Sequence, residues 1–353
     1  MSDLLRELLD ERPWLMADGA TGTNLFAMGL QTGDAPEMWN EEYPERIEAF
    51  HAGMTGAGAD IILTNSFGGS RHRLKLHKAQ DRVTSINATA ARIARRIADK
   101  AGRPVVVAGS IGPTGEIMEP LGPLSFDDAV FAFSEQAAAL AEGGVDVLWI
   151  ETMSSLDEAR AAIEGAKTTG LPFCCTLSFD TNGRTMMGVT AADFAALCHS
   201  FSPAPLAYGA NCGVGAAETI AVLTAMRPSE EPDDIIIAKG NCGIPYYHDG
   251  EIRYDGTPEL MAEYARLARD AGARIIGGCC GTSPEHLRAI RTALEAHEPA
   301  PPPTLDEIVA RLGQISNGAR ALGGGLPDPL LTDSNNRRRN RRRRSTDADD
   351  AAF

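Results

Sequence analysis

Short apolar runs along this chain alternate with longer stretches in which apolar side chains recur every third or fourth position. The runs are rich in Val, Ile, Leu and Ala, and most are apolar throughout rather than at every second residue. Continuous runs of this kind are typical of parallel β-strands that are buried on both faces. We expect eight of them, over residues 14–17, 59–65, 105–110, 145–151, 173–178, 205–212, 235–239 and 274–277.

The stretches between the runs have the periodicity of amphipathic helices. After the last run, Ser283 is a preferred N-cap residue, Pro284 suits the first helical position, and the helix dipole favours Glu285 in a first turn. The sequence therefore predicts that a helix follows the last strand directly. The other helices are expected over residues 44–58, 71–100, 126–142, 156–167, 191–200 and 304–312.

Eight strand–helix units in residues 1–296 predict a single (β/α)8 TIM barrel. In that fold the active site lies at the carboxyl ends of the strands, where residues far apart in sequence meet. Several polar or sulfur-bearing residues fall at or just after predicted strand ends, which supports the assignment. They are Asp18, Asn65, Ser110, Glu151, Asn211, Cys212, Asn241, Cys279 and Cys280. An open, doubly wound sheet is the alternative, but its usual phosphate-binding glycine motif is missing.

The character of the sequence changes after the last predicted helix of the barrel. Residues 297–326 are rich in proline and glycine and are expected to form a linker with one short helix. Residues 327–353 contain an arginine run followed by aspartates, a segregated charge pattern typical of a disordered, solvated tail. Binding of this tail to RNA or to an acidic partner is the alternative interpretation.

The formal net charge of −15 argues against nucleic-acid binding by the barrel and favours a hydrated surface that repels other copies of itself. The seven cysteines are odd in number and lack the regular spacing of a disulfide framework. No apolar stretch is long enough to cross a bilayer, and the amino-terminal residues lack the apolar core of a signal peptide. These features predict a protein of the reducing cytoplasm that has no membrane partner.

Two adjacent cysteines, Cys279 and Cys280, lie between the last predicted strand and the helix after it. Neighbouring side chains on a strand point to opposite faces, so both thiols reach one metal ion only if the backbone bends. The surrounding glycines give the backbone that freedom. Cys212 offers a third thiol, and three thiolates leave one position of a tetrahedral zinc ion open, which is the pattern of a reactive site. Alternatively, these cysteines are buried and inert, or Cys279 and Cys280 form a vicinal disulfide.

Five short motifs occur along the chain in the order Asp18-Gly19-Ala20-Thr21-Gly22-Thr23, Thr64-Asn65-Ser66-Phe67, Glu151-Thr152, Asn211-Cys212-Gly213 and Gly278-Cys279-Cys280-Gly281-Thr282. Together they resemble the homocysteine S-methyltransferases, a family that includes betaine–homocysteine methyltransferase and the homocysteine-binding module of cobalamin-dependent methionine synthase. The resemblance covers about residues 11–296 and implies methylation of homocysteine to methionine. It also implies about one zinc ion per chain, bound by Cys212, Cys279 and Cys280, whose open position takes the homocysteine thiol.

The resemblance further implies which residues hold the amino-acid end of homocysteine. It places Asp18, Gly19 and Glu151 near the ammonium group, where carboxylates would balance its charge. A turn that contains Asn65 and Ser66 is expected to donate hydrogen bonds to the carboxylate of the substrate.

The methyl donor is less directly specified by the sequence. We expect glycine betaine, because Trp39, Tyr246 and Tyr247 could surround a quaternary ammonium group with aromatic faces. Met153 stands where betaine enzymes have an aromatic residue, and residues 68–71 replace their tyrosine-bearing loop. These differences leave open a second donor, a methyl group carried by a separate corrinoid protein.

Two residues near the end of the seventh predicted strand bear on the remaining alternatives. Asn241 is expected to place an oxygen near the open zinc position and so to contact the substrate. Lys239 is the best-placed lysine for a barrel lyase that forms a Schiff base, a function that would need no zinc. A non-catalytic subunit that binds homocysteine or a corrinoid is the other alternative, and it would turn over no methyl donor by itself.

Overall fold

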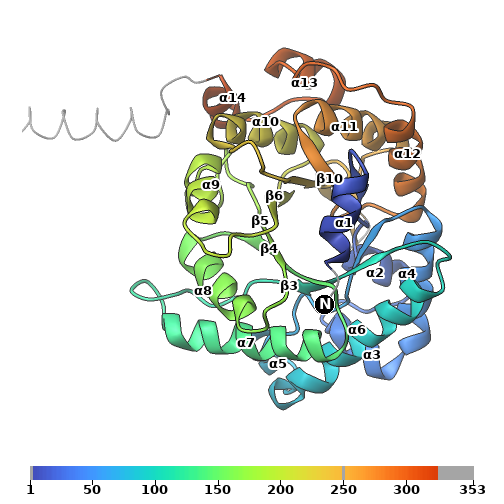
Figure 1. Cartoon of the computed structure of the whole chain (residues 1–353), viewed down its shortest axis with the longest axis vertical. Helices are drawn as coiled ribbons and strands as arrows, with labels where there is room; N and C mark the ends of the chain where they lie inside the picture. The colour runs from blue at the N-terminus through green and yellow to red at the C-terminus, as the bar shows by residue number, and fades with distance from the viewer. Residues whose placement is uncertain (1–2, 249–250, 325–353) are drawn as a thin grey trace, which may run out of the picture.

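The structure is a computed structural model, and it describes residues 3–248 and 251–324. Eight parallel strands form a ring at the centre of the molecule, and helices surround the ring (Figure 1). This arrangement confirms the predicted (β/α)8 barrel. The strands are β1 (Leu15–Met16), β2 (Ile61–Leu63), β3 (Val106–Ile111), β4 (Val147–Met153), β5 (Phe173–Leu177), β6 (Ala207–Cys212), β7 (Ile236–Gly240) and β10 (Ala273–Gly278).

The sheet closes on itself through its first two strands. The strands pair in the order β1-β10-β7-β6-β5-β4-β3-β2, and each of these pairs is parallel. A parallel bridge between Ala17 and Ile61 joins β1 to β2, and the Asp18 amide donates to the Ile61 carbonyl over 3.0 Å. The ring of strands rules out the open, doubly wound sheet.

The outer helices pack small residues against one another and against the barrel. Gly165, for example, lets two helices approach so closely that a Cβ at this position would lie 2.7 Å from the Cβ of Phe133. The helix after β10 begins at Pro284, as predicted, and Ser283 caps it together with His286. The outer helices are α4 (Pro44–Gly56), α6 (Val83–Asp99), α7 (Phe126–Glu142), α8 (Leu156–Lys167), α9 (Ala191–His199), α10 (Ala216–Met226), α11 (Pro258–Asp270) and α12 (Pro284–Glu295).

A helix for which we had no prediction covers the amino ends of the strands. Helix α1 (Leu4–Glu11) buries Leu5, Leu8 and Leu9, whose spacing forms one apolar face. These leucines pack in one cluster with residues near the starts of the strands, such as Val106. Figure 1 shows α1 inside the ring of outer helices. Because α1 covers the amino ends, a site formed by several strands is expected at their carboxyl ends.

Two stretches differ from the predicted elements. The helix expected over residues 71–100 is divided into α5 (Arg71–Lys75) and α6, because Lys78 adopts a left-handed φ of 56° and the chain turns there. Leu74 packs in a small buried cluster with residues on the far side of this turn, which holds the turn in place. After β7 the chain forms an antiparallel hairpin of β8 (Pro245–His248) and β9 (Glu251–Tyr254), where no element was predicted.

Residues after the barrel continue the outer layer. Helices α13 (Leu305–Leu312) and α14 (Asn317–Gly323) contact α10, and the Ser316 hydroxyl donates to the buried Glu218 carboxylate over 2.5 Å. The predicted short helix is thus present, whereas the boundary after residue 296 stays a prediction. The expected tail, residues 327–353, lies outside the described residues. Over residues 3–248 and 251–324, every helix is too short or too polar to span a bilayer.

Candidate active site

Three cysteines from distant parts of the chain meet at the carboxyl end of the barrel. Cys212 is the last residue of β6, and Cys279 and Cys280 follow β10 directly. Their Sγ atoms all lie within 4.8 Å of one another, and those of Cys212 and Cys280 are 3.9 Å apart. All three are free thiols. The structure thus brings together the three residues that the sequence indicated as metal ligands.

The chain bends sharply at the cysteine pair. The Cys279 amide still donates to the end of β7 over 2.9 Å, but the Cys280 amide donates to the side-chain oxygen of Asn241 over 3.0 Å. Gly281 then takes a left-handed φ of 80°, and a Cβ there would lie only 2.5 Å from the ring of Tyr254. The bend therefore depends on glycine at position 281, and it turns both thiols toward Cys212.

Asn241, the first residue after β7, joins the two cysteine-bearing turns. Its Oδ1 accepts from the Cys280 amide, and its Nδ2 donates to the Gly213 carbonyl over 2.6 Å. Cys212 and Gly213 both adopt a left-handed φ, of 62° and 74°, which ends β6 in a tight turn. Both polar atoms of the Asn241 side-chain amide thus hold the cysteine-bearing turns in place. The predicted contact of Asn241 with the substrate stays a prediction.

Hydrogen bonding among the thiols favours one thiolate. Hydrogen bonds with Cys212 and Cys279 lower the pKa of Cys280 well below its ordinary value, whereas hydrogen bonds with the other two sulfurs raise the pKa of Cys212. The Tyr254 side chain also helps to lower the pKa of Cys280. Three converging sulfurs that share negative charge form a donor set suited to zinc. The cluster therefore fits the ion that the sequence implied.

Glu151 lies near the end of β4 with its carboxylate almost enclosed. Ser110, on the neighbouring β3, donates to Glu151 Oε1 over 2.5 Å, and 8% of Glu151 is exposed. Burial raises the pKa of Glu151 to about 7, and the nearby Lys239 opposes that shift. With Oε1 engaged by a hydroxyl, the carboxylate can bind a cation at its other oxygen.

A strained bulge sets the position of Glu151. The pairing of β4 with β5 shifts register here, and Thr152 adopts a φ of 64°, which is rare for a β-branched residue. Asn211 holds this conformation, because its Oδ1 accepts from the Thr152 amide over 2.8 Å and its Nδ2 donates to the Thr152 hydroxyl over 2.7 Å. Asn211 precedes Cys212 in the chain. One side chain therefore links the Glu151 bulge to the cysteines, a role that its place in the sequence motif did not reveal.

Asp18 is fully enclosed and forms a buried ion pair that the sequence analysis missed. Its Oδ1 lies 2.7 Å from Lys239 Nζ, and its Oδ2 accepts from the Leu63 amide over 2.7 Å. Burial by itself lowers the pKa of Lys239, but Asp18 and Glu151 outweigh burial, so the pKa is raised and the amine stays protonated. A paired ammonium group is a poor nucleophile for Schiff-base formation, which argues against the lyase alternative.

The other residues expected around homocysteine are held by internal contacts. The Asn65 side chain donates to the loop after β1 over 2.8 Å, and the Ser66 hydroxyl donates to the Ser110 carbonyl over 2.7 Å. Gly19 approaches the turn after the cysteine pair so closely that a Cβ there would lie 2.5 Å from the Thr282 carbonyl oxygen. Ser66 thus lies next to Ser110, which binds Glu151, and Gly19 lies next to the cysteine turn. The contacts of all three residues with substrate stay predictions.

Two of the residues expected to select the methyl donor are buried in the core. Trp39 is 4% exposed with the Arg46 guanidinium 4.7 Å from its ring centroid, and Met153 is fully buried. The expectation that Trp39 contributes an aromatic face to the donor site is therefore wrong, because its ring is already covered. Tyr246 is 47% exposed on the hairpin after β7. Tyr254, which the sequence analysis did not single out, is the aromatic residue that contacts the cysteine pair.

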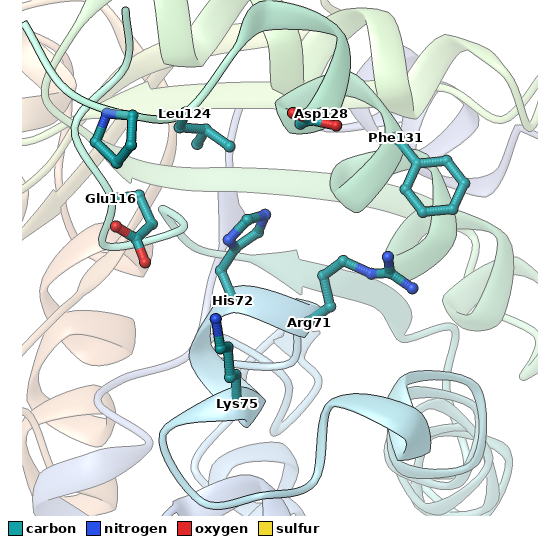
Figure 2. Close-up of a pocket in the computed structure, with 8 residues that line it drawn as sticks. Arg71, His72, Lys75, Glu116, Leu124, Asp128 and Phe131 are labelled. Atoms are coloured by element: carbon teal, nitrogen blue, oxygen red, sulfur yellow. The ribbon is translucent and has the colours of Figure 1, made fainter.

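A pocket of about 270 Å³ lies between α5 and the segment that follows β3 (Figure 2). Arg71, the last of the residues that replace the tyrosine-bearing loop of betaine enzymes, lines this pocket and donates to Glu135 over 2.9 Å and 3.0 Å. Its guanidinium stacks on Phe131 at 4.7 Å from the ring centroid. None of the residues that line the pocket belongs to the cysteine cluster or to the expected homocysteine site, so we do not include it in the active site.

Residues 15–294 match the family model described as homocysteine S-methyltransferase. The methionine synthase of Mycobacterium tuberculosis (strain ATCC 25618 / H37Rv) is 30% identical over 311 residues, which are 83% of this chain and 25% of that protein. The chain therefore spans about a quarter of the length of this curated relative.

A solved structure shows the same architecture. The metallated form of the homocysteine methyltransferase MmuM from Escherichia coli has a TM-score of 0.68 and 25% sequence identity, over 82% of this chain and 99% of MmuM. The oxidized form of that protein gives the same values. The matched range contains the three cysteines, Glu151 and Asp18. From these matches and from the barrel, we conclude that the chain belongs to the homocysteine S-methyltransferase family.

Proposed function

We propose that this chain is a zinc-dependent enzyme that transfers a methyl group from glycine betaine to homocysteine, giving methionine and dimethylglycine. The observation that carries the proposal is the cluster of three free thiols at the carboxyl end of the barrel. Such a set binds a zinc ion and leaves one position for a substrate atom. Cys212, Cys279 and Cys280 are the residues that would hold the ion, and Asn241, which bridges their two turns, would contact the substrate there.

The reaction joins the homocysteine sulfur to a methyl carbon. A zinc ion bound by the cysteines supplies the positive charge that keeps a thiol ionised at neutral pH. The homocysteine sulfur attacks a methyl carbon of glycine betaine and forms the new carbon–sulfur bond. The bond from that carbon to nitrogen breaks, its electron pair leaves with dimethylglycine, and the thiol proton passes to solvent.

In this proposal the amino-acid end of homocysteine lies along the strand ends beside the cysteines. Glu151 accepts from the ammonium group, with Asp18 and Gly19 behind it. The turn at Asn65 and Ser66 donates to the carboxylate. These residues fix the amino acid at two points, which orients the sulfur toward the methyl donor.

The donor end of the proposal rests on the hairpin β8–β9. The Tyr254 ring lies against Gly281, beside the cysteine pair, and Tyr246 is exposed on the same hairpin. An aromatic face beside the reacting sulfur attracts a quaternary ammonium group by about 0.5–2 kcal/mol. The free thiols also need a reducing compartment, and we therefore propose that the protein works in the cytoplasm.

A methyl group delivered by a separate corrinoid protein is the second candidate. The identity with methionine synthase over most of this chain favours it. The chain spans a quarter of that relative, and in this candidate the methyl group would come from a methylated corrinoid protein.

Supplying one donor at a time to the zinc-loaded protein and homocysteine tests the proposed function. The donors are glycine betaine, S-methylmethionine and methylcobalamin, and methionine is measured by chromatography. We expect zinc-dependent formation of methionine from glycine betaine. Methionine from methylcobalamin but not from glycine betaine would instead assign the protein to the corrinoid-linked branch. Homocysteine binding without turnover of any donor would support the non-catalytic subunit.

Two substitutions of one residue serve as a matched pair for the donor site. Tyr254→Leu removes the aromatic face and is expected to raise the KM for glycine betaine about 2- to 30-fold. Tyr254→Phe keeps that face and loses only the hydroxyl, so its KM for betaine should stay near that of the unchanged protein. Equal effects of the two substitutions on this KM would argue against an aromatic contact with the donor.

A further inference from the structure

Lys239 is a buried charged residue at the active site to which the proposed reaction gives no role. It lies on β7, it is 2% exposed, and its ammonium group is 2.7 Å from Asp18 Oδ1. We propose that Lys239 is a positioning residue for homocysteine: by neutralising Asp18, it leaves Glu151 as the one unbalanced carboxylate that binds the ammonium group of the substrate. This inference rests on the proposed function and adds a third charged residue to its substrate site.

The two carboxylates differ in whether a substrate can reach them. Asp18 is 0% exposed, and Lys239 and the Leu63 amide each engage one of its oxygens. Glu151 is 8% exposed, Ser110 engages its Oε1, and its Oε2 accepts no hydrogen bond from the described part of the chain. An incoming ammonium group therefore meets Glu151, whereas Asp18 acts on the substrate only through Lys239.

The charges of the three residues match a single cation. Burial raises the pKa of both carboxylates, and when both are ionised Asp18 and Glu151 carry two negative charges. Lys239 carries one positive charge, so the cluster then has one net negative charge. The ammonium group of homocysteine brings this to zero. Such a match matters in a buried site, because an uncompensated charge that is removed from water is strongly unfavourable.

Without Lys239, the two buried carboxylates would repel each other with no side-chain cation to balance them. The groups that act on Glu151 are Lys239, Cys279, Ser110 and Asp18. Of these, Lys239 contributes most to keeping the Glu151 carboxylate ionised. Two buried carboxylates do not both ionise readily, and one of them takes up a proton. A protonated Glu151 cannot neutralise an ammonium group, so homocysteine would bind weakly although every residue that touches it is unchanged.

The test compares Lys239→Met with the double variant Asp18→Asn/Lys239→Met, both loaded with zinc. Homocysteine binding is measured by calorimetry, and methyl transfer by steady-state kinetics. In Lys239→Met we expect the Kd and KM for homocysteine to rise about 100-fold at neutral pH, with kcat and zinc content close to those of the unchanged protein. The double variant again has one net negative charge, and we expect its Kd to return to within about tenfold of the original.

A merely structural role for Lys239 gives a different pattern. If Lys239 only held β7 to β1, removing Asp18 as well would not restore binding. Asp18→Asn alone leaves a neutral cluster, so it should also weaken homocysteine binding. The double variant therefore binds homocysteine more tightly than either single variant only if net charge is the cause. Raising the pH from about 7 to about 9 should lower the KM of Lys239→Met, because Glu151 then becomes ionised.

Unchanged homocysteine affinity in Lys239→Met, or a double variant that binds as weakly as the single one, overturns the inference. Should Lys239→Met not fold, the double variant and Lys239→Arg decide the question, since both keep one net negative charge and are expected to bind homocysteine within about tenfold of the original Kd. Failure of either to do so also overturns it. A failure of the proposed function is distinct, because the unchanged protein would then bind no homocysteine or methylate none.

Discussion

Each of the substitutions Cys212→Ser, Cys279→Ser and Cys280→Ser is expected to remove zinc and abolish methyl transfer while the barrel stays folded. Serine has no thiolate to offer, and two sulfurs do not complete the set of three protein ligands of a reactive zinc site. Zinc affinity should fall more than about 100-fold, since even changes to residues behind metal ligands lower affinity 10–100-fold. None of the three belongs to the buried clusters of the core, so the fold does not depend on their packing. Metal content is measured by mass spectrometry, and folding by circular dichroism.

Cys242→Ser is the matched control for these substitutions. Cys242 also lies just after β7 at the carboxyl end of the barrel, but its sulfur donates to the Gly256 carbonyl over 3.2 Å and is not in the cluster. A hydroxyl can make the same hydrogen bond, so this variant should keep its zinc and its activity. Full zinc content in all three cluster variants would contradict the assignment of these cysteines as the metal ligands.

Glu151→Gln is expected to weaken homocysteine binding with zinc still present. The amide keeps the size of the carboxylate and can still accept from Ser110, but it cannot neutralise a buried ammonium group. Losing one partner of a buried charge pair costs about 2–5 kcal/mol, which corresponds to a rise in the homocysteine Kd of at least about 30-fold. Calorimetry measures the Kd, and metal analysis confirms that the cysteine cluster is intact.

Glu218→Gln provides the comparison for this substitution. Glu218 is also a buried carboxylate, but it accepts from Ser316 in the outer layer of helices. Its replacement should leave the homocysteine Kd unchanged. A Glu151→Gln variant with unchanged Kd would remove Glu151 from the substrate site and with it the proposed role of Lys239.

The barrel could be predicted because its strands are buried on both faces. Residues 105–108 form an unbroken apolar run within the strand predicted over 105–110, and β3 (Val106–Ile111) coincides with that prediction to within one residue. The break between α5 and α6 could not be predicted in this way, because Arg, Lys and Ala favour a helix on both sides of it. Only the packing of Leu74 against the far side of the turn decides where the chain leaves the helix.

The cysteine cluster could be predicted because strand ends and glycines are visible in the sequence. The side chains that support it could not, because their partners lie far away along the chain. Asn211 and Thr152 are 59 positions apart, and Lys239 and Asp18 are 221 positions apart. Their contacts follow from the order of the strands around the barrel and from their register, which pairs Asn211 with Lys239 on adjacent strands.

X-ray absorption at the zinc edge, with and without substrate, tests the central claim most directly. For the free protein we expect about three sulfur neighbours around zinc. Selenohomocysteine should then add a selenium neighbour, since its reacting atom can be told apart from the sulfurs of Cys212, Cys279 and Cys280. A zinc ion with those three sulfurs and a bound selenium is the result that the account predicts. A protein that holds no zinc, or a zinc ion with no selenium neighbour at saturating selenohomocysteine, would contradict it.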